Sequence, residues 1–381
     1  MIVYPFEHDA RKRAVFAALS LAAGGGRAIW LPVWFGRFAE TGSRVTEALA
    51  RAKRPERGLR LILKRWQLTS HYQWARHHFA AHPGDVAVVW NGLGGVRQAF
   101  AMGARDAGAA VLHAELAPFP GRITLDPAGV NAEGSVPQER GFYEAWADTD
   151  PDRRGQGWRA MGQNLTARPS RRADVGQSHA GLPDTPFLFC PLQVPDDTQV
   201  TLFAGWTGGM EGFLAALRQA AAHLPQGWHL RLKEHPSANQ SLAPLIEPLL
   251  ATGRVVLDNA TDSFAQLAAA KAVVVLNSSM GLQAFFHDKP VVTLGRAFFA
   301  QPGLTAPADD QTALDRLFAD PATISHDPAF RALFMNWLDR AYYPRFTWPG
   351  GVADDAAFAA KLAQAQAQIM ALALSPPNAV R

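Results

Sequence analysis

Two carboxylates in the first half of the chain, Glu115 and Asp126, have the residue type and position for chemistry at a sugar. Glu115 ends an apolar run, and Asp126 ends a second, shorter run just before a proline–glycine turn. Carboxylates at strand ends can act as acid, base or nucleophile at an anomeric carbon. In the alternative, Asp126 only organises its own turn. The residues alone leave both roles open.

A glycine-rich loop lies upstream of these carboxylates. Asn91 and Gly92, followed by Gly94 and Gly95, stand where an apolar run changes to a helical pattern. Glycine there lets the backbone approach a ligand closely. The spacing is not GxGxxG, so a dinucleotide-binding fingerprint is not supported.

A polar loop in the second half resembles a phosphate site. Asn277 and Ser278 follow the apolar run AVVVL and have the residue types that cap a helix, while Gly281 keeps the first turn free of bulk. A helix N-terminus presents N–H groups and a positive dipole end to an anion. A nucleotide phosphate fits this position, and a well-capped core helix is the alternative.

Further polar residues follow two other apolar runs of the second half. Lys233 and His235 alternate toward one face, and Pro236 stops the strand. Gln193 and the acids Asp196 and Asp197 follow the run PFLFCPL. Open α/β sheets bind ligands at the carboxyl ends of their strands. These residues are therefore candidates for binding phosphate, sugar hydroxyls or base, although loop acids are often only solvated.

The elements that must position these residues alternate along the chain. In the first half, apolar runs at 1–6, 28–34, 85–90 and 109–116 alternate with helical stretches at 10–22, 37–54, 71–81 and 95–107. Near-continuous apolar strands separated by helices predict a parallel sheet covered on both faces. After a polar stretch at 145–184 the pattern restarts, so we expect two Rossmann-like domains facing across a cleft.

The expected boundaries follow from this pattern. Residues 1–184 form the acceptor and catalytic domain, of which 145–184 is linker-like. Residues 185–350 form the nucleotide-sugar-binding domain, and 351–381 form a C-terminal helix and tail. The sequence does not show which domain that helix packs on.

Composition limits the class of protein. The chain has 381 residues, 48% hydrophobic and 18% charged, which is typical of a globular enzyme. Its one cysteine, Cys190, lies in an apolar run and is expected to be a buried strand residue, and a reducing compartment fits. No apolar run reaches about 18 residues, so no spanning helix is predicted. His71, His77 and His78 lack matched acids, and no metal site is predicted.

A basic segment covers residues 51–65, with seven cations and the single acid Glu56. Arg54, Arg57, Lys64 and Arg65 are interleaved with leucines and Trp66, a mixture that suits contact with anionic lipid. A core helix with a solvated basic face explains the pattern equally well. No recognised motif supports nucleic-acid binding.

Taken together, these segments resemble the capsule polysaccharide biosynthesis family, which includes retaining β-Kdo transferases that use CMP-Kdo. The matching stretches, in order, are WNG at 90–92, ELAPFPGRITLDPAGVN at 115–131, QVPDD at 193–197, KEHPS at 233–237 and NSSMGLQAFFHDKPVVTLGRAFFAQPGLT at 277–305. The likeness is greatest to single-module members that place the first Kdo on a phosphatidylglycerol-type lipid.

The resemblance implies a GT-B-like fold, a CMP-sugar donor and no cofactor. Asp126 would be the nucleophile, and Glu115 would assist the acceptor hydroxyl or hold the sugar. Asn91, Gly92 and Asn131 would line the acceptor side. The nucleotide sugar would contact the second half, at Gln193, Asp197, Lys233, His235, Pro236, Asn277, Ser278, Ser279, Gly281 and Gln283. The protein would be cytoplasmic and peripheral on the inner membrane.

The sequence departs from the family pattern at two positions. Gln283 stands where many related transferases carry a ribose-binding Glu, and Ala117 replaces the glycine of an E-x-G motif. Two alternatives therefore stay open: a transferase for another nucleotide-activated sugar or polyol phosphate, and a non-catalytic nucleotide- or glycan-binding protein.

Overall fold

The computed structural model describes residues 1–33, 36–52, 56–163, 165, 170–178, 181–182 and 184–374. The chain forms two compact units. Unit 1 comprises residues 1–136 and 338–381, and unit 2 comprises residues 137–337.

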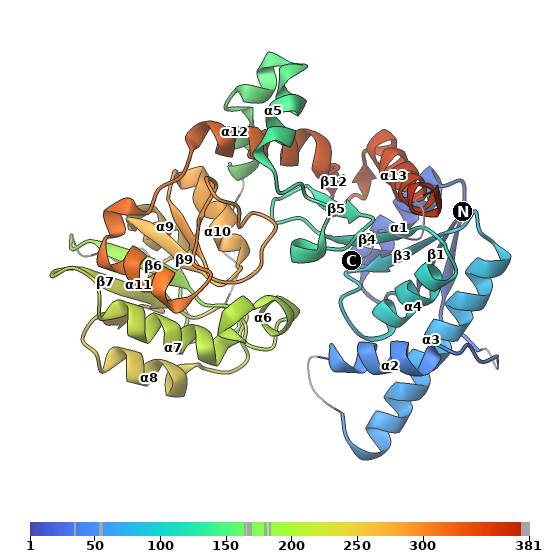
Figure 1. Ribbon diagram of the computed structural model, residues 1–381, viewed down its shortest axis with the longest axis horizontal. Coiled ribbons are helices and arrows are strands. Elements are labelled where there is room, and N and C mark those ends of the chain that lie inside the picture. The colour runs from blue at the N-terminus through green and yellow to red at the C-terminus, as the bar shows by residue number, and fades with distance from the viewer. Residues whose placement is uncertain are drawn as a thin grey trace. The chain divides into compact units, whose positions relative to one another are not determined.

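Unit 1 is built on a five-stranded sheet of order β2-β1-β3-β4-β5 (Figure 1). Its strands are β1 (Ile2–Pro5), β2 (Gly26–Ile29), β3 (Val86–Trp90), β4 (Val111–Leu116) and β5 (Ile123–Asp126). All neighbours are parallel except β4 and β5, which pair antiparallel. The predicted parallel sheet is therefore confirmed, with an added antiparallel edge strand.

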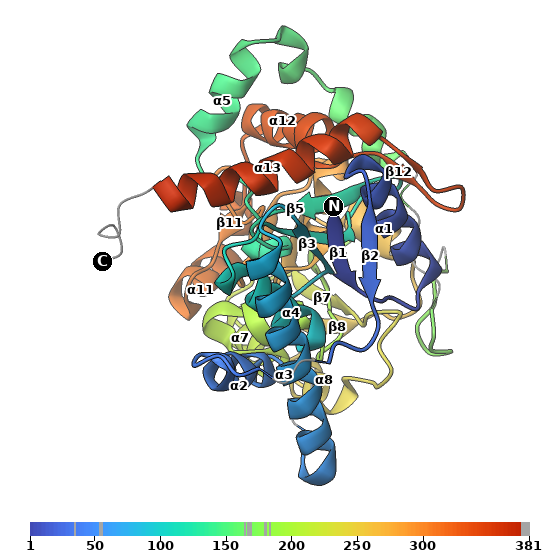
Figure 2. The same ribbon diagram turned by 90° about the vertical axis from the view of Figure 1, so that its right-hand side faces the viewer.

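Helices cover both faces of this sheet, as the continuous apolar strands predicted. They are α1 (Ala10–Ala22), α2 (Thr41–Ala50), α3 (Gly58–Ala81), α4 (Gly95–Asp106) and α13 (Asp355–Leu374). One core joins α1 and α13 to the sheet, and the other joins α3 and α4 to its opposite face. The C-terminal helix, which the sequence could not place, therefore packs on α1 in unit 1 (Figure 2).

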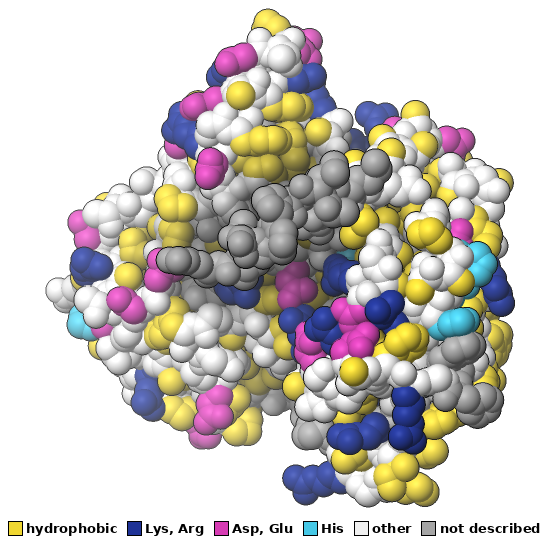
Figure 3. Space-filling view, turned by 45° about the vertical axis from the view of Figure 1, so that its right-hand side comes forward, with side chains coloured by type: hydrophobic (Ala, Val, Ile, Leu, Met, Phe, Trp, Pro, Cys, Tyr) yellow, Lys and Arg dark blue, Asp and Glu magenta, His cyan; other side chains and the backbone are white. Residues whose placement is uncertain are grey.

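Helix α3 begins at Gly58, thirteen residues before the helical stretch expected at 71–81. The first turns of α3 project past the neighbouring helices α2 and α4 (Figure 2). Hydrophobic and cationic side chains are mixed on the surface at that end (Figure 3). Residues 58–65 of the basic segment belong to the helix because they are rich in Leu, Arg and Lys, which are strong helix formers.

Unit 2 contains a six-stranded parallel sheet of order β11-β10-β9-β6-β7-β8. Its strands are β6 (Phe187–Pro191), β7 (His229–Lys233), β8 (Val255–Leu257), β9 (Ala272–Val275), β10 (Val291–Thr293) and β11 (Ala306–Pro307). The expected second α/β repeat is confirmed. Cys190 is fully buried in β6, as predicted, and burial raises the pKa of its thiol.

Eight helices of unit 2 lie among the described residues. They are α5 (Arg140–Asp148), α6 (Thr198–Phe203), α7 (Met210–Ala221), α8 (Ala243–Leu250), α9 (Ser263–Ala269), α10 (Ser279–Gln283), α11 (Gln311–Ala319) and α12 (Pro328–Trp337). After α12 the chain returns to unit 1 through a π-helical turn at Leu338–Tyr342 and a hairpin of β12 (Phe346–Thr347) and β13 (Val352–Ala353).

The compact units divide the chain at other points than the expected 184 and 350. The first part of the stretch taken as linker-like packs on α12 in unit 2, where Trp158 N donates to Asn336 Oδ1 and Asn336 Nδ2 donates to the Arg153 carbonyl. Trp158 is buried, and this large apolar side chain outweighs the polar composition around it. The tail beyond 338 returns to unit 1 because Phe346 and Phe358 complete the core under α1.

The close approach of α3 and α4 gives a stability prediction. A Cβ added at Gly103 would lie 2.3 Å from the Tyr72 carbonyl oxygen and 3.0 Å from the Ala75 Cβ. We expect Gly103→Ala to lower the free energy of unfolding by about 1–3 kcal/mol, because the helices must separate. Gly42→Ala in α2 is the matched control, since nothing lies within 4 Å of its added Cβ. Equal denaturation midpoints for both variants would contradict the packing.

Candidate functional site

The carboxyl edge of the first sheet holds a pocket. The chain leaves β1 through α1 toward β2 and leaves β3 through α4 toward β4, on the other side of β1. Ligands of open α/β sheets bind where the strand order reverses in this way. A cavity of about 360 Å³ lies at this edge of unit 1. It is lined by Asp9, Ala10, Arg11, Lys12, Trp90, Glu115, Leu116 and Trp348.

Glu115 faces this pocket from the end of β4. Its Oε2 accepts a hydrogen bond from Asn91 Nδ2 at 2.9 Å, and its Oε1 accepts from the Leu116 N–H at 2.9 Å. Burial raises the pKa of Glu115, although these bonds oppose the shift. The structure thus brings together Glu115 and Asn91, which the sequence analysis had singled out separately.

His113, which the sequence analysis missed, fixes the loop that carries Asn91. Its Nδ1 lies 2.9 Å from the Asn91 carbonyl oxygen, and its Nε2 lies 2.7 Å from an Arg105 guanidinium nitrogen. Burial and the Arg105 charge lower the pKa of His113 to about 4, so the ring is neutral near pH 7. The same ring would lie 2.5 Å from a Cβ at Gly92, whose φ is +84°, so only glycine fits. His113 and Glu115 are two residues apart in one apolar run, so both side chains point to the same side of the strand, and this spacing was the signal for the role of His113.

Asp126 is fully buried at the end of β5. Its Oδ1 accepts from the N–H groups of residues 128 and 129, at 2.8 and 3.1 Å. Its Oδ2 accepts from the Ser135 N–H and hydroxyl, both at 2.8 Å, and from the Tyr342 hydroxyl at 2.7 Å. Five donors saturate a carboxylate. The contacts match the turn-organising alternative, in which Asp126 holds the loop that contains Asn131.

The other wall of the pocket is the start of α1. Asp9 caps this helix by accepting from the Lys12 N–H at 3.0 Å. The Lys12 ammonium lies 5.3 Å from the centre of the Trp90 ring. Lys12 and Arg11 therefore give the pocket a positive wall, which the helix dipole reinforces. Trp90 and Trp348 add aromatic surface. Of these residues, only Trp90 lies in a stretch that the sequence analysis named, WNG at 90–92.

In unit 2 the strand order reverses between β6 and β9. Gln193 follows β6 and Asn277 follows β9, and they bond to each other: Gln193 Nε2 donates to Asn277 Oδ1 at 2.9 Å. Asn277 Nδ2 also donates to the carbonyls of Gln199 and Phe203, at 2.8 and 3.0 Å. The two predicted nucleotide-binding residues thus lie together at the expected position, with Asn277 buried.

The neighbouring predicted residues begin short helices. Ser278 caps α10 by accepting from the Met280 N–H at 3.2 Å, and Asp197 caps α6 through the Gln199 N–H at 2.9 Å. Ser279 is exposed and Gln283 is half-buried. An added Cβ on Gly281 would lie 3.0 Å from Phe299 and from Val275, so core packing demands this glycine.

Gly208 and Gly209, which sequence reasoning passed over, stand before α7. Both have positive φ, +70° and +152°, which favours glycine. Gly209 is the N-cap of α7 and supplies no side chain to the helix start. The run GWTGGMEG was a visible signal for this conformation.

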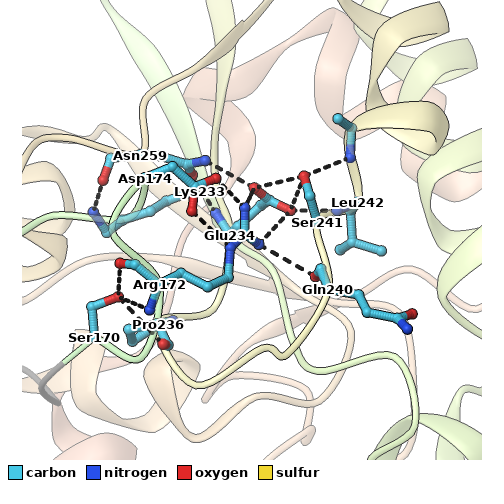
Figure 4. Close-up of polar contacts among 11 residues, drawn as sticks. Ser170, Arg172, Asp174, Lys233, Glu234, Pro236, Gln240, Ser241, Leu242 and Asn259 are labelled. Carbon is cyan, nitrogen blue, oxygen red and sulfur yellow. Dashed lines mark hydrogen bonds and ion pairs between the residues drawn. The ribbon is translucent and has the colours of Figure 1, made fainter.

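Lys233 and the adjacent Glu234 anchor the loop after β7 (Figure 4). The Lys233 ammonium is buried and donates to the carbonyl oxygens of Gly176, Asn259 and Thr261 at 2.7–2.9 Å. An ammonium has three protons, one for each of these carbonyls. The expected contact of Lys233 with the donor stays a prediction, and these three bonds give the ammonium a structural role in the loop.

Glu234, unremarked in the sequence, is the centre of the same cluster (Figure 4). It accepts from Arg172 at 3.1 and 3.0 Å, from Asn259 Nδ2 at 2.9 Å and from the Leu242 N–H at 2.5 Å. Burial alone would raise the pKa of Glu234, but these bonds together hold it below its ordinary value. The cluster ties residues 170–178 to the sheet of unit 2.

His235 and Pro236 complete this loop. His235 Nδ1 accepts from the Ser237 N–H at 3.0 Å, and the Pro236 carbonyl accepts from the Arg171 N–H at 2.8 Å. Both contacts stabilise the turn, and His235 remains half-buried. Its predicted role in binding the donor stays a prediction.

The expected lipid-contact residues lie on one element, except for Arg54, which is outside the described residues. Arg57 precedes α3, and Lys64, Arg65 and Trp66 lie on it. Within the described part of the chain, no helix is long and apolar enough to cross a bilayer. The same residues contain no group of three side chains that could hold a metal ion.

The fold defined by these two units is GT-B-like. KpsC of Thermosulfurimonas dismutans, a β-Kdo 2,7 transferase, superposes with a TM-score of 0.54 at 15% identity, over 96% of this chain and 99% of that one. This likeness supports the predicted fold class.

Sequence comparison finds further likenesses. Residues 170–343 match the model of the capsule polysaccharide biosynthesis protein family. Protein FixF of Sinorhizobium fredii is 28% identical over 291 residues, which is 75% of this chain and 68% of that protein. The capsule polysaccharide modification protein LipB of Neisseria meningitidis serogroup A is 29% identical over 143 residues, only 33% of its length.

The Arg172–Glu234 ion pair gives a second stability prediction. We expect Arg172→Gln to lower the free energy of unfolding of unit 2 by about 3–5 kcal/mol, because it leaves a buried carboxylate without its counter-charge. Arg218→Gln, an exposed change on α7, is the matched control. Chemical denaturation followed by fluorescence measures both.

The same pair sets a pH dependence. Because the folded pKa of Glu234 is depressed, its contribution is complete above the ordinary glutamate pKa and is lost as pH falls through the folded value. The stability difference between Arg172→Gln and the unaltered chain should therefore shrink in acid. A difference that is constant from pH 7 to pH 3 would contradict this role.

Proposed function

We propose that this chain is a glycosyltransferase of capsule polysaccharide biosynthesis that transfers Kdo from CMP-Kdo to a phosphatidylglycerol-type lipid. The observation that carries the proposal is the pocket of unit 1, where Glu115 faces a positive wall and two tryptophans. The match of residues 170–343 to the family model supports the capsule pathway, and the Kdo transferase activity of KpsC, whose fold is similar, supports the sugar.

The pocket suits an acidic sugar or a phosphate-bearing acceptor. Kdo carries a carboxylate, which Arg11, Lys12 and the start of α1 would attract. The faces of Trp90 and Trp348 offer apolar surface to a pyranose ring. Glu115, with its raised pKa, would accept the proton of the acceptor hydroxyl or hold a sugar hydroxyl.

The donor nucleotide would bind in unit 2, at the reversal of strand order beside Gln193 and Asn277. There the side chains bond mainly to one another, and CMP would lie beside the N–H groups of Ser278 and Ser279 and beside half-buried His235 and Gln283. Lys233 would act indirectly, by fixing the loop that carries His235.

The family resemblance implies that Asp126 is the nucleophile of a two-displacement mechanism, which retains the configuration of the sugar. Its five contacts oppose that role, since attack would require the Ser135 and Tyr342 hydroxyls to leave Oδ2. We therefore propose Glu115 as the carboxylate that meets substrate and Asp126 as an anchor of the acceptor-side loop.

The first functional prediction concerns Glu115. With CMP-Kdo and a phosphatidylglycerol acceptor, the purified chain should release CMP and form a glycolipid. Glu115→Gln should lower kcat about 10²–10⁴-fold, because general acid–base assistance is lost. Glu47→Gln on α2, at an exposed ion pair, should keep full turnover. If the unaltered chain releases no CMP from CMP-Kdo but releases nucleotide from another nucleotide sugar, that other sugar is the donor.

The pH profile adds a check on the same residue. If deprotonated Glu115 is the base, kcat/KM should fall below an apparent pKa that lies above the ordinary glutamate value. The residual turnover of Glu115→Gln should lack this acidic limb. If the acidic limb of the pH profile is unchanged in Glu115→Gln, the titration of another group causes it.

A further prediction separates the two roles of Asp126. We expect Tyr342→Phe to lower the free energy of unfolding by about 1–3 kcal/mol, since a hydrogen bond to a buried carboxylate is lost. Tyr343→Phe, which leaves the five contacts of Asp126 intact, is the matched control. After incubation with donor alone, mass spectrometry should find no sugar on the peptide that contains Asp126. A Kdo adduct at Asp126 would restore it as the nucleophile.

A further inference from the structure

An exposed apolar stripe runs along the start of α3. Leu59, Ile62, Leu63 and Trp66 are 71%, 65%, 54% and 56% exposed. Their spacing of three, four and seven residues places them on one side of the helix. Single exposed apolar side chains are ordinary, but a contiguous group marks a surface that another phase or molecule covers.

The packing of α3 explains why this stripe is exposed to solvent. Helices α3 and α4 run parallel: the Lys64 ammonium lies 3.7 Å from the Cβ position of Gly95, and the Tyr72 carbonyl lies against Gly103. Gly95 is the first residue of α4, directly after the carboxyl end of β3. The residues of α3 before Lys64 therefore extend beyond the carboxyl edge of the first sheet (Figure 2).

Cations surround the stripe. Arg57, Arg60 and Arg65 are exposed, and Glu56 is the acid next to them in the sequence. We call residues 57–66 the α3 tip. On the surface its hydrophobic and cationic side chains lie side by side (Figure 3). A surface of mixed apolar and basic side chains is complementary to a phase that has an anionic surface and an apolar interior.

A second apolar group lies at the same edge of the sheet. Trp30, Leu31 and Val33 follow the carboxyl end of β2 and are 62%, 70% and 57% exposed. Trp30 stacks on Phe6, which follows β1, with ring centres 4.2 Å apart. Exposed apolar side chains therefore occur at two places on the edge that also holds the Glu115 pocket.

We propose that the α3 tip inserts into an anionic lipid bilayer and seats the carboxyl edge of the first sheet on its surface. Leu59, Ile62, Leu63 and Trp66 enter at the depth of the upper acyl chains. Arg57, Arg60 and Arg65 contact lipid phosphates. The charge favours a bilayer, because the cations flank the stripe and complement an anionic surface. The pocket then opens at the plane where a lipid-linked acceptor presents its head group.

Vesicle flotation tests this surface directly. The unaltered chain should float with phosphatidylglycerol-containing vesicles and stay unbound with pure phosphatidylcholine at physiological salt. A variant with Leu59, Ile62, Leu63 and Trp66 all changed to Gln should bind at least about tenfold more weakly. A variant with Arg57, Arg60 and Arg65 changed to Gln should lose about fivefold for each cation, and its binding should depend less on salt.

The control variant changes Leu245 and Leu250 to Gln, which are exposed apolar residues on α8 of unit 2. It should float like the unaltered chain. Circular dichroism and denaturation midpoints equal to those of the unaltered chain show that each variant is folded. A stripe variant that is folded and floats undiminished would overturn the proposal. So would a stripe variant that changes only the oligomeric state, since the tip would then join copies of the chain.

The measurement contains no nucleotide sugar, so its outcome does not depend on the transferase proposal. Loss of CMP release with intact flotation would reject the proposed reaction alone. Loss of flotation in the unaltered chain with intact turnover on a short-chain, water-soluble acceptor would reject the membrane surface alone.

Discussion

The order of strands in each sheet is the constraint on which both candidate sites depend. In unit 1 the first strand lies between β2 and β3, and in unit 2 the first strand lies between β9 and β7. The chain must therefore leave two adjacent strands in opposite directions. The loops part at the carboxyl edge. In unit 1 the pocket at this edge is lined by residues that follow β1 and by residues at the ends of β3 and β4, including Glu115, and in unit 2 Gln193 and Asn277 meet where the order reverses.

Burial then decides what the polar residues near these edges can do. Asp126, Lys233 and Glu234 have the types expected of catalytic or ligand-binding groups, yet each is buried and fully bonded within its own unit. A buried charge is costly unless it is paired. Such residues therefore hold loops in place. Glu115 differs because one side of it meets the pocket.

The pocket and the exposed apolar residues of unit 1 lie at the same edge of its sheet. The start of α1 supplies positive charge, β3 and β4 supply Trp90 and Glu115, and α3 extends past the same edge. A transferase that modifies a lipid would need a substrate pocket and a lipid-contacting surface close together. The parallel packing of α3 on α4 provides that arrangement, because both helices run away from the carboxyl edge.

Sequence alone determined the alternation of strands and helices and the two α/β units, because hydrophobic periodicity is a local property. It also singled out Glu115, Asn91, Gln193 and Asn277, which the fold brings together in pairs. It could not separate anchors from pocket residues, since Asp126 and Glu115 look alike until five donors close around one of them. His113, Glu234 and Lys12 gained their roles from partners distant in the chain. The division into units was likewise decided by tertiary packing, because buried Trp158 and Phe358 outweigh the composition of the segments around them.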